Sequence, residues 1–253
     1  MAGHNASAPV VAVKDLQLSF GETVIQKDLT FTVRRGDVFI IMGPSGCGKS
    51  TLLRHLIGLQ APSAGTVYYG DDDLWGLTEA ERIRLLRRIG VLFQGGALWS
   101  SLTVAENIAL PMRHYTRLSA AEIRGQVDFK LALVGLDGYR DLWPAQLSGG
   151  MRKRVGLARA LALDPEILFF DEPSSGLDPL SARRLDDLIL ELRESLAATL
   201  VVVTHELASI FAIGSNGIFL DPEMRTMIAS GSPEEMLAAG NPKVREFLQR
   251  GEA

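Results

Sequence analysis

The sequence lacks the features that disulfide-linked, secreted or membrane-spanning chains need. Cys47 is the single cysteine among 253 residues, so no disulfide can form within the chain, which favours a reducing compartment. No apolar run approaches the roughly 18 residues of a membrane-spanning helix. The opening stretch, MAGHNASAPVVAVKD, has no basic run before an apolar segment, so we expect no signal peptide. Together these absences predict a soluble cytoplasmic protein. If it works at a membrane, another chain would hold it there.

A basic surface is also absent from the composition. The formal net charge is −4, so we expect no nucleic-acid partner. The chain shows no internal repeat and no low-complexity segment. Its hydrophobic fraction of 47% is enough for a substantial core, and its length indicates one large domain or one domain with a subdomain.

Short, nearly continuous apolar runs dominate the sequence pattern. They suit strands buried on both faces, as in a parallel sheet, and they read VFIIMG, IGVLFQ, ILFFDE and TLVVVTHE. Longer helix-like stretches separate them, which predicts an α/β fold. Leu29, Phe31 and Val33 alternate with polar residues and predict a half-buried strand.

The rest of the chain suggests its organisation. Residues 95–163 are expected to form an inserted α-helical subdomain within a single domain at 8–253, whose core comprises 8–94 and 164–230. GIFLDPEMRTMIASG predicts a hairpin with Asp221 and Pro222 at its turn. The last part, 231–253, is expected to hold one capped helix and a short tail.

One glycine-rich segment fits a phosphate-binding loop. Gly43, Gly48, Lys49 and Ser50 match G-x-x-x-x-G-K-[ST] between a predicted strand and a predicted helix, the context that this motif requires. Backbone N–H groups of the loop and the helix N-terminus favour phosphate, Lys49 can reach the β and γ oxygens, and Ser50 can bind Mg²⁺. The residues expected to bind nucleotide here are Gly43, Pro44, Ser45, Gly46, Cys47, Gly48, Lys49, Ser50 and Thr51. Nothing near Cys47 indicates a redox role.

Two adjacent acids end another predicted strand. Neighbouring strand residues point to opposite sides, so Asp171 and Glu172 can take different roles. We expect Asp171 to hold Mg²⁺, directly or through water, and Glu172 to orient and deprotonate the attacking water. The alternative is a solvent-facing pair that caps the strand, and the phosphate loop favours the catalytic interpretation.

Gln94 ends another predicted strand, VLFQ, and His205 follows the predicted strand VVVT. Both are expected where the loops of a parallel sheet meet a bound phosphate. Gln94 can hold Mg²⁺ or the water, and His205 can donate to the γ-phosphate; the alternative for each is a surface polar group. His4, His55 and His114 have no comparable setting.

A second anion-binding helix start lies in LSGGMRKRVGLARAL. Ser148 can cap this helix, and Gly149 and Gly150 leave its first N–H groups accessible. Two phosphate-binding devices in one chain suggest a two-fold dimer that closes over two nucleotides, each between the phosphate loop of one subunit and the Ser148 helix of the other. The basic residues of this helix are expected mostly to face solvent; they are Arg152, Lys153, Arg154 and Arg159.

Taken in order, these motifs resemble those of an ATP-binding cassette (ABC) ATPase over nearly the whole chain. The segments are GPSGCGKST, Gln94, LSGGM, ILFFDE, SSGLD and His205. The resemblance implies a RecA-like P-loop core with an N-terminal antiparallel β region, an inserted helical subdomain, and a head-to-tail dimer that binds ATP and Mg²⁺. It also implies that Phe20 stacks on adenine, that Ser148 to Gly150 contact the γ-phosphate of the opposite subunit, and that Asp178 lies in a loop coupling the two sites. Phe20 stands where many members have Tyr, and Met151 where Gln is common.

Longer stretches resemble the Mla and Mce lipid-transport ATPases within that family. They are VLFQGGALWSSLTVAENIALPMR, LSGGMRKRVGLARALALDPEILFFDEP and NPKVREFLQR. The resemblance implies phospholipid transport across the cell envelope, with the ATPase at the cytoplasmic face of the inner membrane. It implies as partners a multi-span permease, an Mce-domain lipid-binding protein and a small cytosolic accessory protein. Trp99, Leu102 and Val104 are candidates for the permease contact, with subdomain core as the alternative. SSGLDP and the short tail after Phe247 depart from some Mla members.

Other functions fit the sequence less well. An importer ATPase for an amino acid or metal would share the motifs, and only the resemblance of the segment from Gly95 to Arg113 argues against it. ABC proteins of DNA repair or translation usually carry a coiled coil or two cassettes. A P-loop GTPase would need an N-K-x-D motif, which this sequence lacks. A purely structural role would leave both predicted phosphate-binding sites unexplained.

Overall fold

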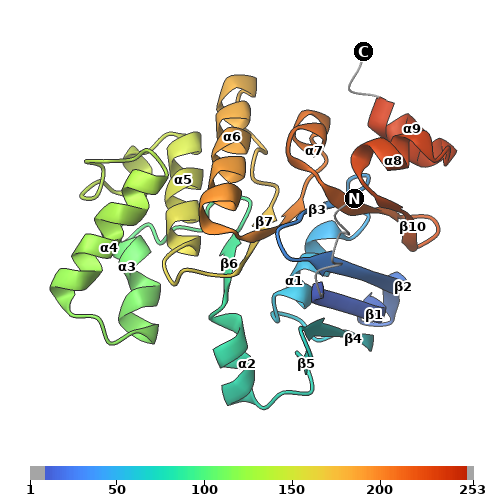
Figure 1. The fold of residues 1–253 in the computed structure, drawn as a ribbon, viewed down its shortest axis with the longest axis horizontal. Helices are drawn as coiled ribbons and strands as arrows, with labels where there is room; N and C mark the ends of the chain where they lie inside the picture. Colours follow the sequence, from blue (N-terminus) through green and yellow to red (C-terminus); the bar gives the residue numbers. More distant parts are fainter. Residues whose placement is uncertain (1–8, 250–253) are drawn as a thin grey trace, which may run out of the picture. The chain divides into compact units, whose positions relative to one another are not determined.

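A computed structural model describes residues 9–249 of the chain (Figure 1). The chain divides into two compact units, one combining Met1–Arg84 with Thr199–Ala253 and the other comprising Leu85–Ala198. The finer boundaries predicted from the sequence, with a helical subdomain at 95–163, remain a prediction. Position 8 of the predicted domain, its last residues 250–253 and His4 lie outside the described residues.

An antiparallel sheet forms part of the first unit. Its strands run in the order β2-β1-β4-β5, and they are β1 (Pro9–Phe20), β2 (Thr23–Arg34), β4 (Ala64–Tyr69) and β5 (Asp72–Asp73). Leu29, Phe31 and Val33 are buried on β2 and alternate with exposed residues, as predicted. Alternating burial of this kind marks a sheet with one face on the core.

Parallel strands of the same unit lead to the phosphate loop. β3 (Val38–Met42) pairs in parallel with β8 (Thr199–Val203) and with β9 (Asn216–Asp221). Every residue of β3 and β8 is buried, which is why both segments are continuous apolar runs. β9 returns as β10 (Thr226–Gly231) in the predicted antiparallel hairpin. Asp221 begins the turn, because its Oδ1 accepts from the N–H groups of Glu223 (2.8 Å) and Met224 (2.7 Å).

Helices complete the first unit. They are α1 (Lys49–Leu56), α7 (Leu207–Ile213), α8 (Pro233–Ala238) and α9 (Pro242–Gln249), and α2 (Glu79–Leu86) leads into the second unit. The expectation of one C-terminal helix and a tail was wrong. Gly240 has a φ of 85° and Pro242 begins a new helix, since proline cannot continue a helical hydrogen-bond ladder. The ring of Phe247 on α9 packs edge-on against that of Phe219 on β9, with 5.1 Å between the ring centroids, so this second helix packs against the sheet.

The second unit combines a parallel strand pair with helices. β6 (Ile89–Leu92) pairs with β7 (Ile167–Asp171). The helices are α3 (Val104–Tyr115), α4 (Ala120–Leu133), the short 3₁₀ helix η1 (Pro144–Gln146), α5 (Gly149–Ala160) and α6 (Pro179–Leu196). α3 and α4 begin with capping boxes, Thr103 with Glu106 and Ser119 with Glu122, so local sequence sets both starts. α3, α4 and α5 all lie within residues 95–163, which were expected to be mostly helical.

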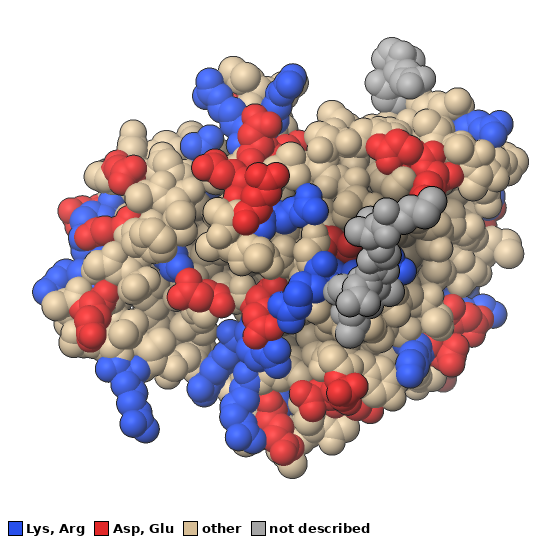
Figure 2. Space-filling view, in the orientation of Figure 1, with Lys and Arg blue, Asp and Glu red and all other residues tan. Residues whose placement is uncertain are grey.

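The lengths of the helices and the distribution of surface charge both bear on possible partners. Within residues 9–249, no helix has both the length and the apolar character needed to cross a lipid bilayer. Basic and acidic side chains are interspersed on the face shown in Figure 2, consistent with the net charge of −4.

Candidate functional site

The phosphate loop joins β3 to α1 in the first unit. Gly43, Gly46 and Gly48 have φ values of 146°, 80° and 98°, which favour glycine. A Cβ at Gly43 would lie 2.5 Å from the carbonyl oxygen of Leu220, and one at Gly48 would lie 2.8 Å from Cγ2 of Ile25. A Cβ at Gly46 would meet nothing within 4 Å. The loop is therefore packed at both ends and open at its middle, as a cradle for phosphate must be.

Lys49 lies inside the curve of this loop. It is the first residue of α1 and is buried, and its Nζ donates to the carbonyl oxygens of Gly43 (2.8 Å) and Pro44 (3.0 Å). Both acceptors belong to the loop itself, so the ammonium is held where an anion in the cradle would meet it. Ser50 and Thr51 follow in the first turn of α1.

Gln26 supports the loop from β2, a role that no motif in the sequence predicted. This fully buried side chain donates from Nε2 to the carbonyl oxygens of Cys47 (2.7 Å) and Asp221 (3.2 Å). A polar residue at an inward position of an alternating strand was the signal available. Cys47 itself is buried, and burial raises the pKa of its thiol, which disfavours the reactive thiolate.

His205 and the phosphate loop line one cavity. This cavity of about 540 Å³ includes Pro44, Ser45 and His205, together with Lys243 and Phe247 of α9. His205 is exposed, in the second position after β8, so its ring is accessible. Phe20, at the end of β1, is 79% exposed, and its ring is available for stacking.

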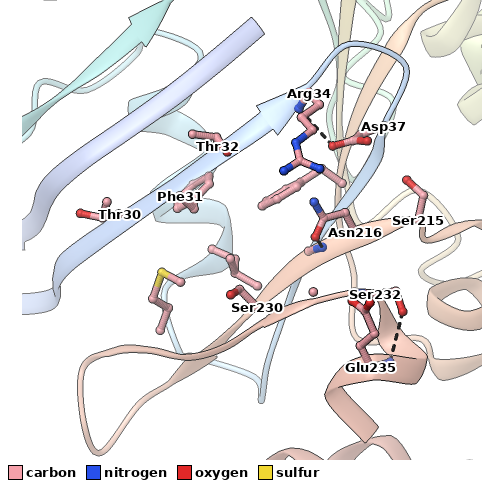
Figure 3. Close-up of a pocket in the computed structure, with 15 residues that line it drawn as sticks. Thr30, Phe31, Thr32, Arg34, Asp37, Ser215, Asn216, Ser230, Ser232 and Glu235 are labelled. Atoms are coloured by element: carbon pink, nitrogen blue, oxygen red, sulfur yellow. Dashed lines mark hydrogen bonds between the residues drawn. The ribbon is translucent and has the colours of Figure 1, made fainter. Parts of the chain in front are cut away.

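A separate cavity of about 530 Å³ lies at the amino ends of β3 and β9 (Figure 3). Asp37 there accepts from the main-chain N–H of Arg34 (3.0 Å), and Glu235 accepts from that of Ser232 (2.9 Å). The phosphate loop instead follows the carboxyl end of β3, where parallel sheets bind their ligands. We therefore assign this second cavity no part in nucleotide binding.

Glu172 departs from the geometry expected of a strand end. β7 ends at Asp171, and Glu172 has a φ of 50°, in the left-handed region. The expectation that strand alternation sets the directions of Asp171 and Glu172 was therefore wrong, because Glu172 lies outside the strand. Glu172 is buried, whereas Asp171 is partly exposed.

Gln94 is also placed differently from the expectation. β6 ends at Leu92, so Gln94 lies in the following loop, where its exposed side chain donates from Nε2 to Oγ of Ser175 at 3.4 Å. The structure thus brings Gln94 to the segment that follows Glu172 within the second unit. The loop position leaves its amide oxygen accessible for a metal or a water.

The predicted helix cap at Ser148 is confirmed. Its Oγ accepts from the N–H of Met151 (3.2 Å), and Gly149 and Gly150 are the first residues of α5. Asp178 caps α6 in the same unit, with Oδ1 accepting from the N–H of Ser181 (3.0 Å). Hydrogen bonds from Ser181 lower the pKa of Asp178, so this side chain is an anion at neutral pH.

The expectation of a solvated basic face on α5 was wrong for two of its residues. Lys153 is buried and donates to main-chain carbonyls that follow β7. Arg159 donates to the carbonyl oxygens of Gly96 (2.9 Å) and Ala97 (2.8 Å). Their acceptors are backbone groups distant in sequence, which no side-chain pattern reveals. Arg152 is exposed, as expected.

The three candidates for a permease contact differ in their solvent exposure. Trp99 is 60% exposed, Leu102 is partly buried and Val104 is 0% exposed. Val104 therefore belongs to the core, and the contact interpretation was wrong for it. Trp99 remains available to a partner.

The chemistry of the proposed metal ligands fits Mg²⁺. Ser50, Gln94 and Asp171 offer hydroxyl, amide and carboxylate oxygens, the donors that this hard cation prefers. Among residues 9–249, no group of three or more His, Cys, Asp and Glu side chains could hold a metal. Mg²⁺ bound to phosphate oxygens usually takes one or two carboxylates from the protein, and the proposed ligands include one, that of Asp171.

Comparison with known proteins decides the family. The model of the family described as ABC transporter matches residues 26–175. This chain belongs to the ABC transporter family. The family expected from the motif order is therefore confirmed.

Relatives match nearly the whole cassette. The probable ribonucleotide transport ATP-binding protein mkl of Mycobacterium tuberculosis is 41% identical over 238 residues, which are 94% of this chain and 66% of the relative. The cassette thus spans just under two thirds of the length of that relative. The intermembrane phospholipid transport system ATP-binding protein MlaF of Escherichia coli K12 is 38% identical over 241 residues, 95% of this chain and 89% of the relative.

Solved structures confirm the predicted fold class. A dimeric post-hydrolysis state of the ATP-binding cassette MJ0796, bound to ADP and Pi, aligns with a TM-score of 0.79 at 32% identity, covering 88% of this chain and 98% of that one. The cbiO1 protein of Clostridium perfringens, part of the ABC transporter complex cbiONQ, aligns with a TM-score of 0.83 at 27% identity, covering 96% of each chain. The α/β cassette with an N-terminal antiparallel sheet is thus the ABC ATPase fold.

Proposed function

We propose that this cassette is the ATP-hydrolysing subunit of an ABC transporter that moves phospholipid across a cell envelope. The observation that carries the ATPase assignment is the placement of the Lys49 ammonium inside the phosphate loop, bonded to the carbonyls of Gly43 and Pro44. The 38% identity with MlaF over 95% of the chain supports phospholipid as the cargo.

In this proposal each site residue has one role in hydrolysis. Phe20 stacks on adenine, and the loop from Gly43 to Thr51 binds the phosphates. Glu172 accepts the proton of the water that attacks the γ-phosphorus, as the bond to the ADP oxygen breaks. His205 donates to the γ-phosphate, and Lys49 stabilises the charge that spreads over its oxygens. Ser50, Gln94 and Asp171 would hold Mg²⁺, which neutralises phosphate charge when bound.

A second copy of the chain completes each site. Ser148, Gly149 and Gly150 of one subunit would contact the γ-phosphate on the loop of the other, and Asp178 would couple the two sites. The accessible start of α5, capped by Ser148, supports this role, and the solved cassette MJ0796 is described as dimeric. ATP would close the pair, and hydrolysis would reopen it.

The membrane partners follow from the lipid-transport assignment. A multi-span permease would hold the cassette at the cytoplasmic face of the inner membrane, with Trp99 as a contact residue. An Mce-domain protein would bind the lipid, and a small cytosolic protein would complete the complex. The mycobacterial relatives are named for ribonucleotide transport, which makes a ribonucleotide the alternative cargo.

Two substitutions test the ATPase assignment. Glu172→Gln removes the base but keeps the shape, so it should bind ATP, trap the dimer and nearly abolish phosphate release. Lys49→Ala removes the loop cation and should chiefly lose nucleotide binding in a fluorescent nucleotide titration. Rapid hydrolysis by Glu172→Gln would exclude Glu172 as the base, and wild-type nucleotide affinity in Lys49→Ala would exclude the loop assignment.

The cargo requires a separate experiment. The Glu172→Gln chain, tagged and purified from detergent-solubilised membranes of its host, should carry a multi-span permease, an Mce-domain protein and phospholipid, identified by mass spectrometry. A permease with a periplasmic solute-binding protein, or with bound ribonucleotide, would contradict the lipid assignment and leave the ATPase assignment in place.

A further inference from the structure

Lys153 is a buried cation in the second unit that the roles above do not use. Its side chain, on α5, is 6% exposed. Nζ donates to the carbonyl oxygen of Glu172 at 3.3 Å and to those of Pro173 and Ser175 at 2.5 Å each. An ammonium has three N–H donors and no acceptor, so these carbonyls use all of its donors.

The charge of Lys153 is compensated locally. Burial lowers the pKa of the ammonium, and the negative charge of Glu172 acts in the opposite direction. The carbonyl dipoles stabilise a cation further. A neutral side chain of the same length would leave the carbonyls without these donors.

The main chain that Lys153 holds is strained. Glu172 has a φ of 50°, which a residue with a Cβ adopts at an energetic cost. Three carbonyls within four consecutive residues converge on one nitrogen, so the three hydrogen bonds together restrain this turn. Such strain persists only where the surroundings over-determine the backbone.

The hydrogen bonds of Lys153 connect α5 with the main chain at Glu172, and these two elements have different roles in the proposed dimer. α5 begins at Ser148, whose helix start would face the nucleotide of the opposite subunit. Glu172 would act on the nucleotide of its own subunit, and the segment after it leads to Asp178. Lys153 thus joins, within one unit, an element that senses one nucleotide to a residue that hydrolyses the other.

We propose that Lys153 is a positioning residue for ATP hydrolysis, which fixes the main chain of Glu172 to the helix that begins at Ser148. The inference rests on the proposed ATPase function. It predicts that loss of the ammonium misplaces the Glu172 carboxylate and leaves nucleotide binding unchanged, because the phosphate loop belongs to the other unit.

The test compares kcat and KM for ATP in the wild type, Lys153→Met and Lys153→Arg. Lys153→Met should lower kcat by about 10- to 100-fold with little change in KM, the size expected for a displacement of about 1 Å at the reacting groups. Lys153→Arg should recover part of kcat, since its charge and donors return in a planar arrangement. In the Glu172→Gln background, Lys153→Met should still form the ATP-bound dimer.

Lys130→Met is the matched control. Lys130 is also a buried lysine of this unit, 1% exposed, but it pairs with Asp164. Its substitution should lower the melting temperature and leave kcat per folded molecule unchanged. Wild-type kcat in Lys153→Met, or an equal loss of kcat in Lys130→Met, would overturn the positioning role.

The remaining outcomes also decide the inference. If Lys153→Met does not fold, Lys153→Arg decides: a lower kcat at unchanged KM supports the role, and wild-type kcat overturns it. If the wild type releases no phosphate from ATP, the proposed function and the inference both fall. If the wild type hydrolyses ATP and the Lys153 variants match it, only the inference falls.

Discussion

The side-chain amide of Gln26 donates to the main-chain carbonyl of Cys47 at 2.7 Å. The same nitrogen reaches the carbonyl of Asp221 at 3.2 Å, so one fully buried residue of β2 joins the phosphate loop to the end of β9. The conformation of the loop thus depends on a residue outside its motif.

Gln26→Met should weaken both the fold and nucleotide binding. Methionine has a similar length but no donor, so two buried carbonyls lose a partner and the free energy of unfolding should fall by about 1–3 kcal/mol. Urea unfolding and a fluorescent nucleotide titration measure the two effects. Gln17→Met, at a partly exposed position of β1, is the control, and an equal loss there would contradict the assigned role.

Substitutions of Trp99 and Val104 should have different effects, because Trp99 is a candidate for partner binding and Val104 packs in the core. Val104→Ala removes two buried methyl groups and should lower the free energy of unfolding by roughly 1–3 kcal/mol. Trp99→Ala should change it by less than about 0.5 kcal/mol, because this side chain is 60% exposed. The isolated cassette should keep its ATPase activity in Trp99→Ala, while stimulation by the permease in proteoliposomes falls. Unchanged stimulation would exclude Trp99 from the contact.

Asp221 and Lys243 should make stability depend on pH. Burial acts to raise the pKa of Asp221, but the ammonium of Lys243 and the N–H groups of Met224 and Glu223 outweigh it and lower this pKa below its ordinary value of 3.8. The hydrogen bonds that Lys243 donates to the carboxylates of Asp221 and Glu223 raise the pKa of Lys243 above 10.5. The stabilisation by Asp221 is therefore present above its unfolded pKa and lost as pH falls through the folded value. That of Lys243 is present below its unfolded pKa and lost as pH rises through the folded value.

Asp221→Asn isolates this charge effect. Asparagine can still accept from Met224 and Glu223, so chiefly the negative charge is lost. The wild type should melt at a higher temperature than the variant near neutral pH, and the difference should shrink towards about pH 2 and again above the pKa of Lys243. A difference in melting temperature that stays constant from neutral pH to about pH 2 would rule out the ion pair as its source.

Local composition predicted much of the fold because local chemistry determines it. β3 and β8 are buried on both faces and are therefore continuous apolar runs. The cap of α5 is a short-range hydrogen bond between residues three apart, so Ser148 predicted it directly. The break before α9 was equally visible in Gly240 and Pro242, and the expectation of a single helix ignored that signal.

The roles of Gln26 and Lys153, which hold the main chain of the candidate site, could not be predicted from the sequence for a physical reason. Gln26 and Lys153 bind main-chain carbonyls, which every residue possesses and no side-chain pattern distinguishes. Sequence distance adds to the difficulty, since Gln26 and Asp221 are 195 residues apart. Trp99 and Val104 are both apolar and close in sequence, yet Trp99 lies before the capped start of α3 and is exposed, whereas Val104 is the first residue of α3 and is buried.

Under the proposed function, the left-handed backbone of Glu172 sets catalysis against thermal stability. A φ of 50° costs glutamate roughly 1 kcal/mol or more, whereas asparagine adopts this conformation more readily. Selection of this chain for heat resistance alone would favour Glu172→Asn where relief of this strain outweighs the loss of the negative charge near the Lys153 ammonium. In the proposed mechanism, such a variant would lack the proton acceptor and would bind ATP without hydrolysing it.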